Sequence, residues 1–253
     1  MSANTFGRIF KFHSFGESHG SALGATIEGC PAGLTFNQEL LHYNLSRRRP
    51  GQSVVSTSRL ELDQFEVLSG VFEGKTLGTP ITMIVHNQDA RSQDYQQIKS
   101  QPRVGHADDV WKDKFSWTDW RGGGRSSGRE TLARVLAGSV AQMLVQQLSL
   151  ETKVIGFTRA IHNIEIDIED SESIDQLFRG QFDLESNRVR MPSVKKAKTA
   201  EELLIRGKEI GESYGGVADI HILRPLKGLG QPVFRKLKSD LAAAYMSVGA
   251  VCG

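Results

Sequence analysis

The sequence predicts an α+β fold of antiparallel strands and long helices, and two observations carry this prediction. Apolar and polar residues alternate through much of 59–87, which is typical of two or three antiparallel strands. The second observation is a repeated pattern: from residue 25 the sequence predicts a strand, then a turn with Pro and Gly, then a helix, and the same order begins again at residue 218. The repetition indicates two related halves, although chance explains it about equally well because this punctuation is common.

The N-terminal part contains two predicted strands and a helix. Phe6–His13 alternates apolar residues with Gly, Arg and Lys, and Ala22–Glu28 is a second short strand. Thr35–Arg49 carries leucines at helical spacing behind a Thr/Asn cap and stops before a Pro-Gly pair. We therefore expect a helix that carries three arginines to its C-terminal end.

The remaining elements are expected as follows. Residues 88–124 form a long polar loop, and its three Trp and one His indicate a functional segment rather than disorder. Gly128–Leu148 is the longest helical pattern, is apolar on most faces and should be buried. Residues 168–200 are polar and charged, which predicts a surface excursion, and Val233–Tyr245 is a further helix.

Composition places the chain among ordinary globular proteins. It has 253 residues, 39% of them hydrophobic, and 2 Cys, which excludes disordered, collagen-like and disulfide-scaffold classes. A net charge of +2 is too small for a nucleic-acid coat. No stretch approaches the ~20 apolar residues of a membrane span, and the start lacks a signal peptide, so we expect a cytoplasmic protein. Cys30 and Cys252 are expected to be reduced packing thiols, without a metal site.

Arginine is concentrated in the first half of the chain. Of the 31 cationic residues 18 are Arg, and 11 of these precede Gly138. A guanidinium binds carboxylate or phosphate through two parallel hydrogen bonds, so this distribution favours anion recognition. Arginine also serves surfaces well, and composition alone leaves the two interpretations about even.

Gly16–Gly20, the GESHG turn, matches the G-x-S-x-G pattern of the α/β-hydrolase nucleophile elbow. An elbow leads from a strand into a helix, whereas a strand is predicted after this turn, so a serine hydrolase acting through Ser18 is the weakest hypothesis. The common alternative is an ordinary polar turn. The flanking glycines allow close approach of the backbone to a ligand and present His19 as a proton donor near neutral pH.

The run Arg47–Arg49 has a simple explanation, because cations at a helix C-terminus complement the helix dipole and lie in water. Three consecutive side chains nevertheless point in different directions around a helix. We therefore expect at least one of them to face the molecule and to need an anion.

Gly122–Thr131 is the most informative motif, and it begins with the GGGRSS loop of Gly122–Ser127. Its glycines, two hydroxyls and predicted helix start, marked by the capping-box spacing of Ser127 and Glu130, form a cradle for an anion or phosphate. Arginines at such an end oppose the helix dipole, which indicates that a bound anion offsets them. An ordinary capped helix is the less favoured alternative. His106, in the preceding loop, gains significance only if that loop folds over the cradle.

Four motifs in one order resemble the chorismate synthase family: Gly16–Gly20, Arg47–Gly51, Gly105–Asp108 and Gly122–Thr131. The resemblance covers essentially the whole chain, and the ordered set is far more specific than any one motif. It implies a single chorismate synthase-like domain over 1–253, with two antiparallel sheets sandwiching helices and with internal pseudosymmetry.

The resemblance also implies an activity and a cofactor. Members of the family are lyases of the shikimate pathway, in aromatic amino acid biosynthesis, and eliminate phosphate from 5-enolpyruvylshikimate 3-phosphate in an anti-1,4 sense to give chorismate. The reaction has no net redox change but requires reduced FMN. By analogy we expect a homotetramer whose flavin is reduced by a flavin reductase or by an intrinsic NADPH-dependent activity.

Residue by residue, the resemblance implies that His19 protonates the leaving phosphate and that His106 protonates or steadies the reduced flavin. Substrate binding is implied for Ser18, Arg48, Arg49 and Arg129. Flavin contacts are implied for Arg125, Ser126, Ser127, Gly249 and Ala250.

The chain also departs from the family pattern. Val54 stands where the family usually has another Arg, Gly128 where it has Ala, and Gly249 where it has a side chain against the flavin. Family members continue beyond the position of Gly253 with a segment that holds a further flavin loop, so we expect the domain to be incomplete at its C-terminus. The alternative to an active lyase is a non-catalytic flavin- or anion-binding remnant of the same fold.

Overall fold

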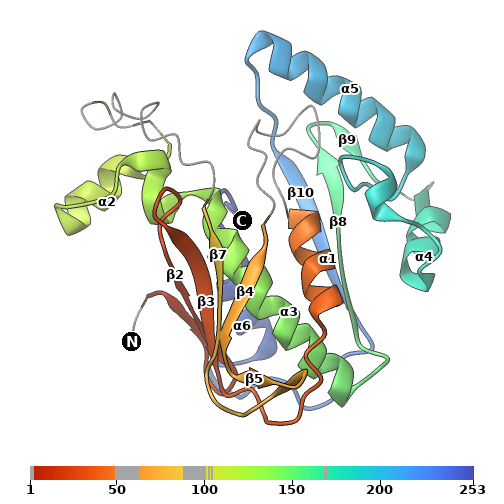
Figure 1. The fold of residues 1–253 in the computed structure, drawn as a ribbon. Coiled ribbons are helices and arrows are strands. Elements are labelled where there is room, and N and C mark those ends of the chain that lie inside the picture. The colour runs from red at the N-terminus through yellow and green to blue at the C-terminus, as the bar shows by residue number, and fades with distance from the viewer. Residues whose placement is uncertain (1–2, 49–62, 88–100, 102, 104, 168–169) are drawn as a thin grey trace. The chain divides into compact units, whose positions relative to one another are not determined.

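The computed structural model describes residues 3–48, 63–87, 101, 103, 105–167 and 170–253, and it divides into two compact units (Figure 1). The described residues up to 148, together with 227–253, form the first unit, and 149–226 belong to the second. Each unit has its own apolar core, and the expected single domain over 1–253 stays a prediction. No helix in the described ranges is both long enough and apolar enough to cross a membrane.

A five-stranded antiparallel sheet is the framework of the first unit, in the order β1-β2-β3-β7-β4 (Figure 1). Its central strand β3 (Ala22–Glu28) lies between β2 (Lys11–Phe15) and β7 (Ile81–His86). β1 (Thr5–Gly7) and β4 (Phe65–Ser69) form the edges. The antiparallel α+β architecture and the strand predicted over 22–28 are therefore confirmed.

The single strand predicted over Phe6–His13 is wrong, because the chain reverses direction there and forms the β1–β2 hairpin. Gly7 lies in the reversal with φ +93°, and a Cβ at this position would lie 2.2 Å from the carbonyl oxygen of Phe10. Glycine alone permits this close approach. The apolar alternation that suggested one strand thus continues across two strands of opposite direction.

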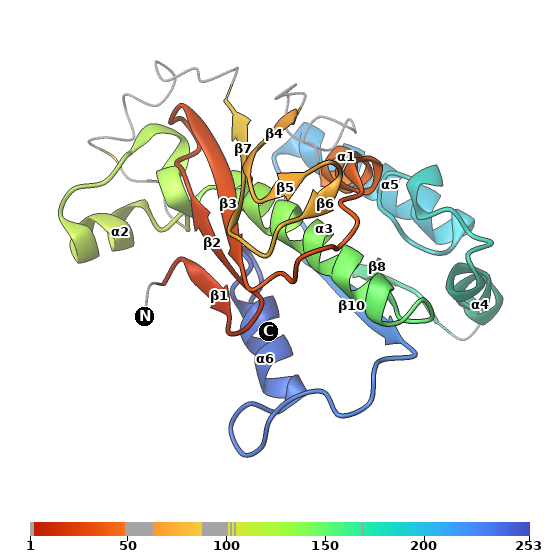
Figure 2. The ribbon, with the colours of Figure 1, turned by 60° about the horizontal axis from the view of Figure 1, so that its bottom comes forward.

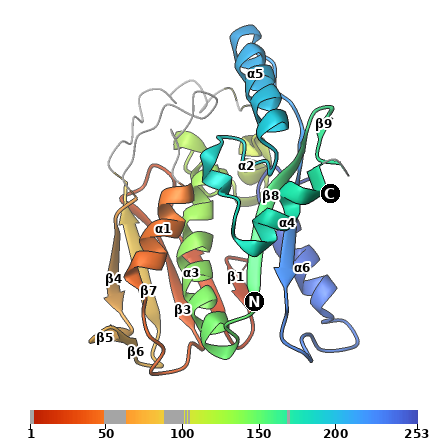
Figure 3. The same cartoon turned by 90° about the vertical axis from the view of Figure 1, so that its right-hand side faces the viewer.

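Two helices cover one face of this sheet, as Figures 2 and 3 show: α3 packs against β3, and α1 packs against α3. In α1 (Gln38–Arg48) the side-chain oxygen of Asn37 caps the first turn by accepting a hydrogen bond from Leu40 N at 2.9 Å. α3 (Thr131–Leu148) follows a 3₁₀ turn. Both predicted helices are confirmed. The core between them and the sheet includes Leu23, Ile27, Leu41, Leu45, Ile81, Met83, Leu132 and Leu136.

The segment predicted as one polar loop over 88–124 contains helical structure in its described part, so this prediction is wrong. α2 (Asp108–Phe115) is a short helix, and Arg121–Ser126 consists of 3₁₀ turns interrupted at Gly122–Gly124, where φ is positive. α2 buries no side chain. Its first turn begins with two aspartates, which stabilise a helix N-terminus. Hydrophobic periodicity does not report such a local signal.

Three smaller elements complete the first unit. β5 (Val71–Phe72) and β6 (Lys75–Thr76) form a hairpin between β4 and β7. α6 (Leu237–Met246) begins later than the predicted start at Val233, because a hydrogen-bonded turn over 231–235 precedes it. Beyond α6 Cys252 is exposed, so the expected packing role applies to the buried Cys30 alone.

A three-stranded antiparallel sheet, in the order β10-β8-β9, organises the second unit. Sequence reasoning missed its long central strand, β8 (Lys153–Ile161). β8 pairs with β10 (Gly216–Leu223), which the sequence predicts around residues 218–222, and with β9 (Ile164–Glu165).

The surface excursion predicted over 168–200 is wrong, because it contains α4 (Ser171–Arg179) and the start of α5 (Val194–Ile210). The segment is rich in charged residues, but it also contains small and apolar residues that are buried. Leu177 on α4 and Ala200 on α5 belong to the cores of this unit. The apolar face is narrow, and the composition of the segment therefore conceals it.

We expect Leu136→Ala to lower the free energy of unfolding by about 2–5 kcal/mol, because it opens a cavity where α3 meets the sheet. Urea denaturation followed by circular dichroism measures the change. Gln147→Ala, at an exposed position of the same helix, is the control and should change stability by no more than about 0.5 kcal/mol. Equal effects of the two substitutions would contradict the assigned packing.

Candidate active site

Hydrogen bonds join the GESHG turn to the GGGRSS loop in the first unit. Ser18 N donates to Gly124 O at 3.2 Å. Arg125 donates from Nη1 to Gly16 O at 2.9 Å and from Nη2 to Ser14 O at 3.1 Å. The guanidinium that the family resemblance assigns to the flavin therefore holds the two motifs together.

Ser18 and His19 are buried within the GESHG turn, and a hydrogen bond joins their side chains. Ser18 Oγ lies 3.1 Å from Gly122 O and 3.1 Å from His19 Nδ1. A carbonyl oxygen only accepts, so the hydroxyl hydrogen points to Gly122 and the hydroxyl oxygen accepts from Nδ1–H. In this arrangement Nδ1 carries a hydrogen and is the ring nitrogen that Ser18 holds.

The surroundings of Ser18 do not support the serine hydrolase hypothesis. The side chain has no exposed surface. The chain continues from the GESHG turn into β3, whereas a nucleophile elbow continues into a helix. The hydroxyl of Ser18 instead orients the imidazole of His19.

Gly122 supports His19 from the GGGRSS loop. Its φ is +58°, and a Cβ at this position would lie 2.1 Å from Cε1 and 2.2 Å from Nδ1 of His19. The conformation and the contact both require glycine. Gly122 therefore leaves room for the imidazole, a role that sequence reasoning did not separate from a general anion cradle.

Asp119 places a negative charge near His19. Its two carboxylate oxygens each accept a hydrogen bond from the guanidinium of Arg121 at 2.8 Å. Burial raises the pKa of Asp119, but the hydrogen bonds from Arg121 outweigh it, and the pKa is lower than usual, with a smaller contribution from His19. The carboxylate is therefore ionised at neutral pH.

His106 lies on an exposed loop that is attached to the GGGRSS loop. Ser126 Oγ is 3.3 Å from His106 O and donates to Gly123 O at 2.7 Å. On the other side of His106, Arg103 Nε donates to Asp108 Oδ2 at 3.0 Å. Burial raises the pKa of Asp108, but the hydrogen bonds from Arg103 outweigh this effect, so the pKa is lower than usual. The loop of His106 therefore contacts the GGGRSS loop through Ser126, and the role of His106 stays a prediction.

Arg48 and Arg129 meet at a carboxylate that sequence reasoning missed. Arg48 Nη1 donates to Asp63 Oδ2 at 2.9 Å, and Arg129 Nη1 donates to Asp63 Oδ1 at 3.1 Å. The side chain of Asp63 is 1% exposed and that of Arg129 is 3% exposed. Asp63 belongs to no motif, so only the fold indicates its importance.

The arginine run behaves partly as expected. Arg48 faces the molecule and meets an anion, which confirms that at least one of the three does so. Arg47 lies over the ring of Tyr43, with 5.7 Å between the guanidinium carbon and the ring centroid. Arg49 and Val54 lie outside the described residues.

Ser127 caps the 3₁₀ turn that precedes α3, where its Oγ accepts a hydrogen bond from Arg129 N at 3.3 Å. The predicted capping box is only half formed. The carboxylate of Glu130 does not bond back to the cap but accepts from Ser14 Oγ at 3.0 Å and from Arg134 Nε at 2.8 Å. The helix start is thus confirmed, and Glu130 provides a further link to β2.

Gly249 and Ala250 lie in an exposed segment beyond α6. A Cβ at Gly249 would have open space around it. Ala250 has φ +66°, in the left-handed region. Their flavin contacts stay a prediction.

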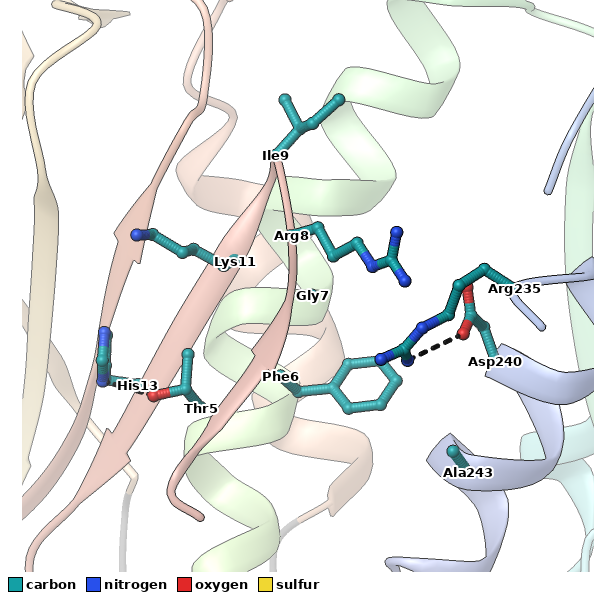
Figure 4. A pocket seen from close by; sticks show the side chains of 10 residues that line it. All are labelled: Thr5, Phe6, Gly7, Arg8, Ile9, Lys11, His13, Arg235, Asp240 and Ala243. Carbon is teal, nitrogen blue, oxygen red and sulfur yellow. Dashed lines mark hydrogen bonds and ion pairs between the residues drawn. The ribbon is translucent and has the colours of Figure 1, made fainter. Parts of the chain in front are cut away.

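A cavity of about 910 Å³ lies elsewhere in the first unit, between the β1–β2 hairpin and α6 (Figure 4). Arg8 and Arg235 extend toward each other from its two walls, and Asp240 pairs with Arg235 at 3.5 Å. The residues that line it include none of the predicted site residues. The cavity is therefore separate from the candidate active site.

We expect Gly122→Ala to displace the imidazole of His19, because the new methyl group would overlap the ring and φ is positive. The imidazole resonances of His19 in a ¹H–¹⁵N NMR spectrum report the displacement. Gly128→Ala is the matched control, since a Cβ there meets no atom within 4 Å. Unchanged His19 resonances in Gly122→Ala would contradict the geometry.

Comparison with known proteins points to one family. The family model described as chorismate synthase matches residues 10–253. A curated chorismate synthase of Bdellovibrio bacteriovorus is 54% identical over the whole chain, which covers 73% of that protein. Those of Methanosphaera stadtmanae and Methanocaldococcus jannaschii are 46% and 44% identical over 99% of the chain, and the chain covers 67% of each.

A solved structure gives the same result. A crystal structure of chorismate synthase matches 97% of the chain with a TM-score of 0.74 and 30% identity, and the chain covers 68% of that protein. Sequence and fold thus agree over nearly the full length of the chain. The chain belongs to the chorismate synthase family.

Proposed function

We propose that this protein acts as a chorismate synthase, a lyase that eliminates phosphate from 5-enolpyruvylshikimate 3-phosphate to give chorismate with the aid of reduced FMN. One observation supports this most strongly. Motifs more than 100 residues apart come together so that His19, a buried proton carrier, lies on one hydrogen-bonded framework with the Arg48–Arg129 pair.

His19 suits the task of proton donor to the departing phosphate. In an elimination the C–O bond to phosphate and a ring C–H bond break, a second ring double bond forms, and the phosphate leaves with the bonding pair. A proton supplied to that oxygen makes it a better leaving group. Ser18 accepts a hydrogen bond from Nδ1–H and so orients the imidazole that delivers the proton.

The two arginines suit the anionic substrate, which carries a phosphate and two carboxylates. Arg48 ends α1, and Arg129 lies in the 3₁₀ turn that precedes α3. The N-terminus of a helix adds a positive field and main-chain N–H donors. A low-dielectric site with charges already in place stabilises an anion better than mobile surface cations do.

The residues present fit a flavin beside the GGGRSS loop. Open space surrounds the Cβ positions of Gly105 and Gly128. His106, which follows Gly105 in the chain, is exposed, and its carbonyl accepts a hydrogen bond from Ser126 in the GGGRSS loop. When bound, reduced FMN supplies an electron transiently and accepts the ring proton at N5. His106 is the residue that would hold or donate a proton at the flavin, and Ser126, whose hydroxyl bonds to the carbonyl of His106, and Ser127 are further proposed flavin contacts.

The same family membership supports proposals on the cellular setting. We expect a cytoplasmic homotetramer of the shikimate pathway, with the flavin reduced by a flavin reductase or by NADPH on the enzyme itself. Sedimentation velocity tests the assembly. Anaerobic mixing with NADPH and FMN distinguishes the two routes of reduction.

Activity is tested anaerobically with chemically reduced FMN and 5-enolpyruvylshikimate 3-phosphate, following phosphate release and chorismate absorbance. We expect His19→Ala to lower kcat about 10²–10⁴-fold through loss of the proton donor, and His106→Ala to lower it at least about tenfold. His162→Asn, in a turn of the second unit, is the control and should retain full activity.

The outcomes separate the alternatives. FMN binding without phosphate release from the unsubstituted chain would favour a non-catalytic remnant. Absence of both would overturn the proposed function. Full activity of His19→Ala would contradict the assigned proton donor.

A further inference from the structure

We propose that Asp63 is the positioning residue of the anion site: its carboxylate holds Arg48 and Arg129 as one pair, at the separation and orientation that an anionic substrate requires. This inference rests on the proposed function for the identity of the substrate. It adds a residue that no motif contains and that comes from a different part of the chain than the two arginines.

The geometry is that of a bridge between two cations. Each oxygen of Asp63 accepts from one guanidinium, Oδ2 from Arg48 at 2.9 Å and Oδ1 from Arg129 at 3.1 Å. The side chain of Asp63 is 1% exposed, that of Arg48 14% and that of Arg129 3%. A shared buried carboxylate therefore sets the distance between two guanidiniums that would otherwise repel each other.

A second hydrogen bond fixes the plane of each guanidinium. Arg48 Nε is 3.3 Å from Thr131 Oγ1, in the first turn of α3. Arg129 Nε donates to Asn87 Oδ1 at 2.7 Å. Two attachment points on a rigid planar group determine its orientation as well as its position.

The sign of its charge distinguishes the role of Asp63 from that of a simple anion-binding group. A carboxylate by itself repels an anionic substrate. Its two oxygens each bind one guanidinium in a site with little exposed surface, next to the start of α3. Asp63 therefore favours anion binding by keeping the two guanidiniums in place.

The pair is also connected to the proton donor. Asn87, which holds Arg129, donates from Nδ2 to Glu17 O at 3.2 Å and to Gly20 O at 2.8 Å. These carbonyls lie on either side of His19 in the GESHG turn. A shift of Arg129 would therefore disturb the segment that carries His19, which a purely local ion pair would not do.

Three roles of Asp63 predict different results for Asp63→Asn. If Asp63 only adds negative charge, its neutralisation tightens anion binding. If it only stabilises the fold, the melting temperature falls while anion affinity is retained. If it positions the arginines, anion affinity falls although the site becomes more positive.

The experiment measures binding of inorganic phosphate by isothermal titration calorimetry, together with KM and kcat for 5-enolpyruvylshikimate 3-phosphate. We expect Asp63→Asn to weaken phosphate binding and to raise KM roughly tenfold or more. Asp63→Glu keeps the bridging carboxylate and should recover most of the loss. Asp240→Asn, which breaks an exposed pair with Arg235, is the matched control and should change neither quantity.

An independent measurement covers the case in which Asp63→Asn does not fold. In the unsubstituted protein, phosphate should shift the Nε–H resonances of both Arg48 and Arg129, identified by their loss in Arg48→Lys and Arg129→Lys. Unshifted resonances, or unchanged or tighter phosphate binding in Asp63→Asn, would overturn the proposal. Phosphate binding that depends on Asp63 in a chain without turnover would leave the Asp63 assignment intact and reject the proposed function instead.

Discussion

The hydrogen bonds from the guanidinium of Arg125 to the carbonyls of Ser14 and Gly16 are the interactions on which the rest of the site depends. They join the end of β2 to the loop that leads into α3, and they do so through main-chain atoms, whose positions follow the backbone alone. Once this junction is formed, Ser18 N reaches Gly124 O, and the hydroxyl of Ser18 reaches Gly122 O. These contacts set the orientation of the His19 imidazole. Arg125, whose charge suggests a role in ligand binding, therefore acts first by holding two backbone segments together.

Four other arginines around the site share a different property: protein carboxylates hold Arg48, Arg103, Arg121 and Arg129 before any ligand arrives. Arg121 pairs with Asp119, and Arg103 pairs with Asp108. Guanidiniums held in this way need little rearrangement when an anion binds, and this lowers the free-energy cost of binding and of charge development during reaction. Arg48 and Arg129 are both bound by the carboxylate of Asp63. The polarity of the site is thus set by how acidic residues are distributed among the arginines, which the nearly neutral net charge of the chain conceals.

Much of this could be predicted from sequence, and the failures have physical causes. The buried periodicity of β3 and α3 and the cap at Asn37 are local signals, so those elements were predictable. The β1–β2 reversal was not, since it depends on one glycine within an otherwise strand-like alternation, and α4 and α5 were hidden by their charged faces. In the site, the ordered motifs pointed to the correct segments. Asp63 and Asn87 were missed, because their roles arise from contacts 15 or more residues away in the chain and from no local pattern.

The absence of any buried side chain on α6 has a consequence for the way in which the first unit opens. The helix is attached mainly near its end, where Arg134 donates hydrogen bonds to the side chain and the carbonyl of Ser247 at 2.7 and 2.8 Å. Little apolar surface is exposed when it separates, so its opening free energy should lie far below that of β3 and α3. Native-state hydrogen exchange would then show α6 amides exchanging by local opening while the central sheet exchanges only by global unfolding. In that case the hydrogen bonds between the GESHG turn and the GGGRSS loop would remain intact while α6 opens locally.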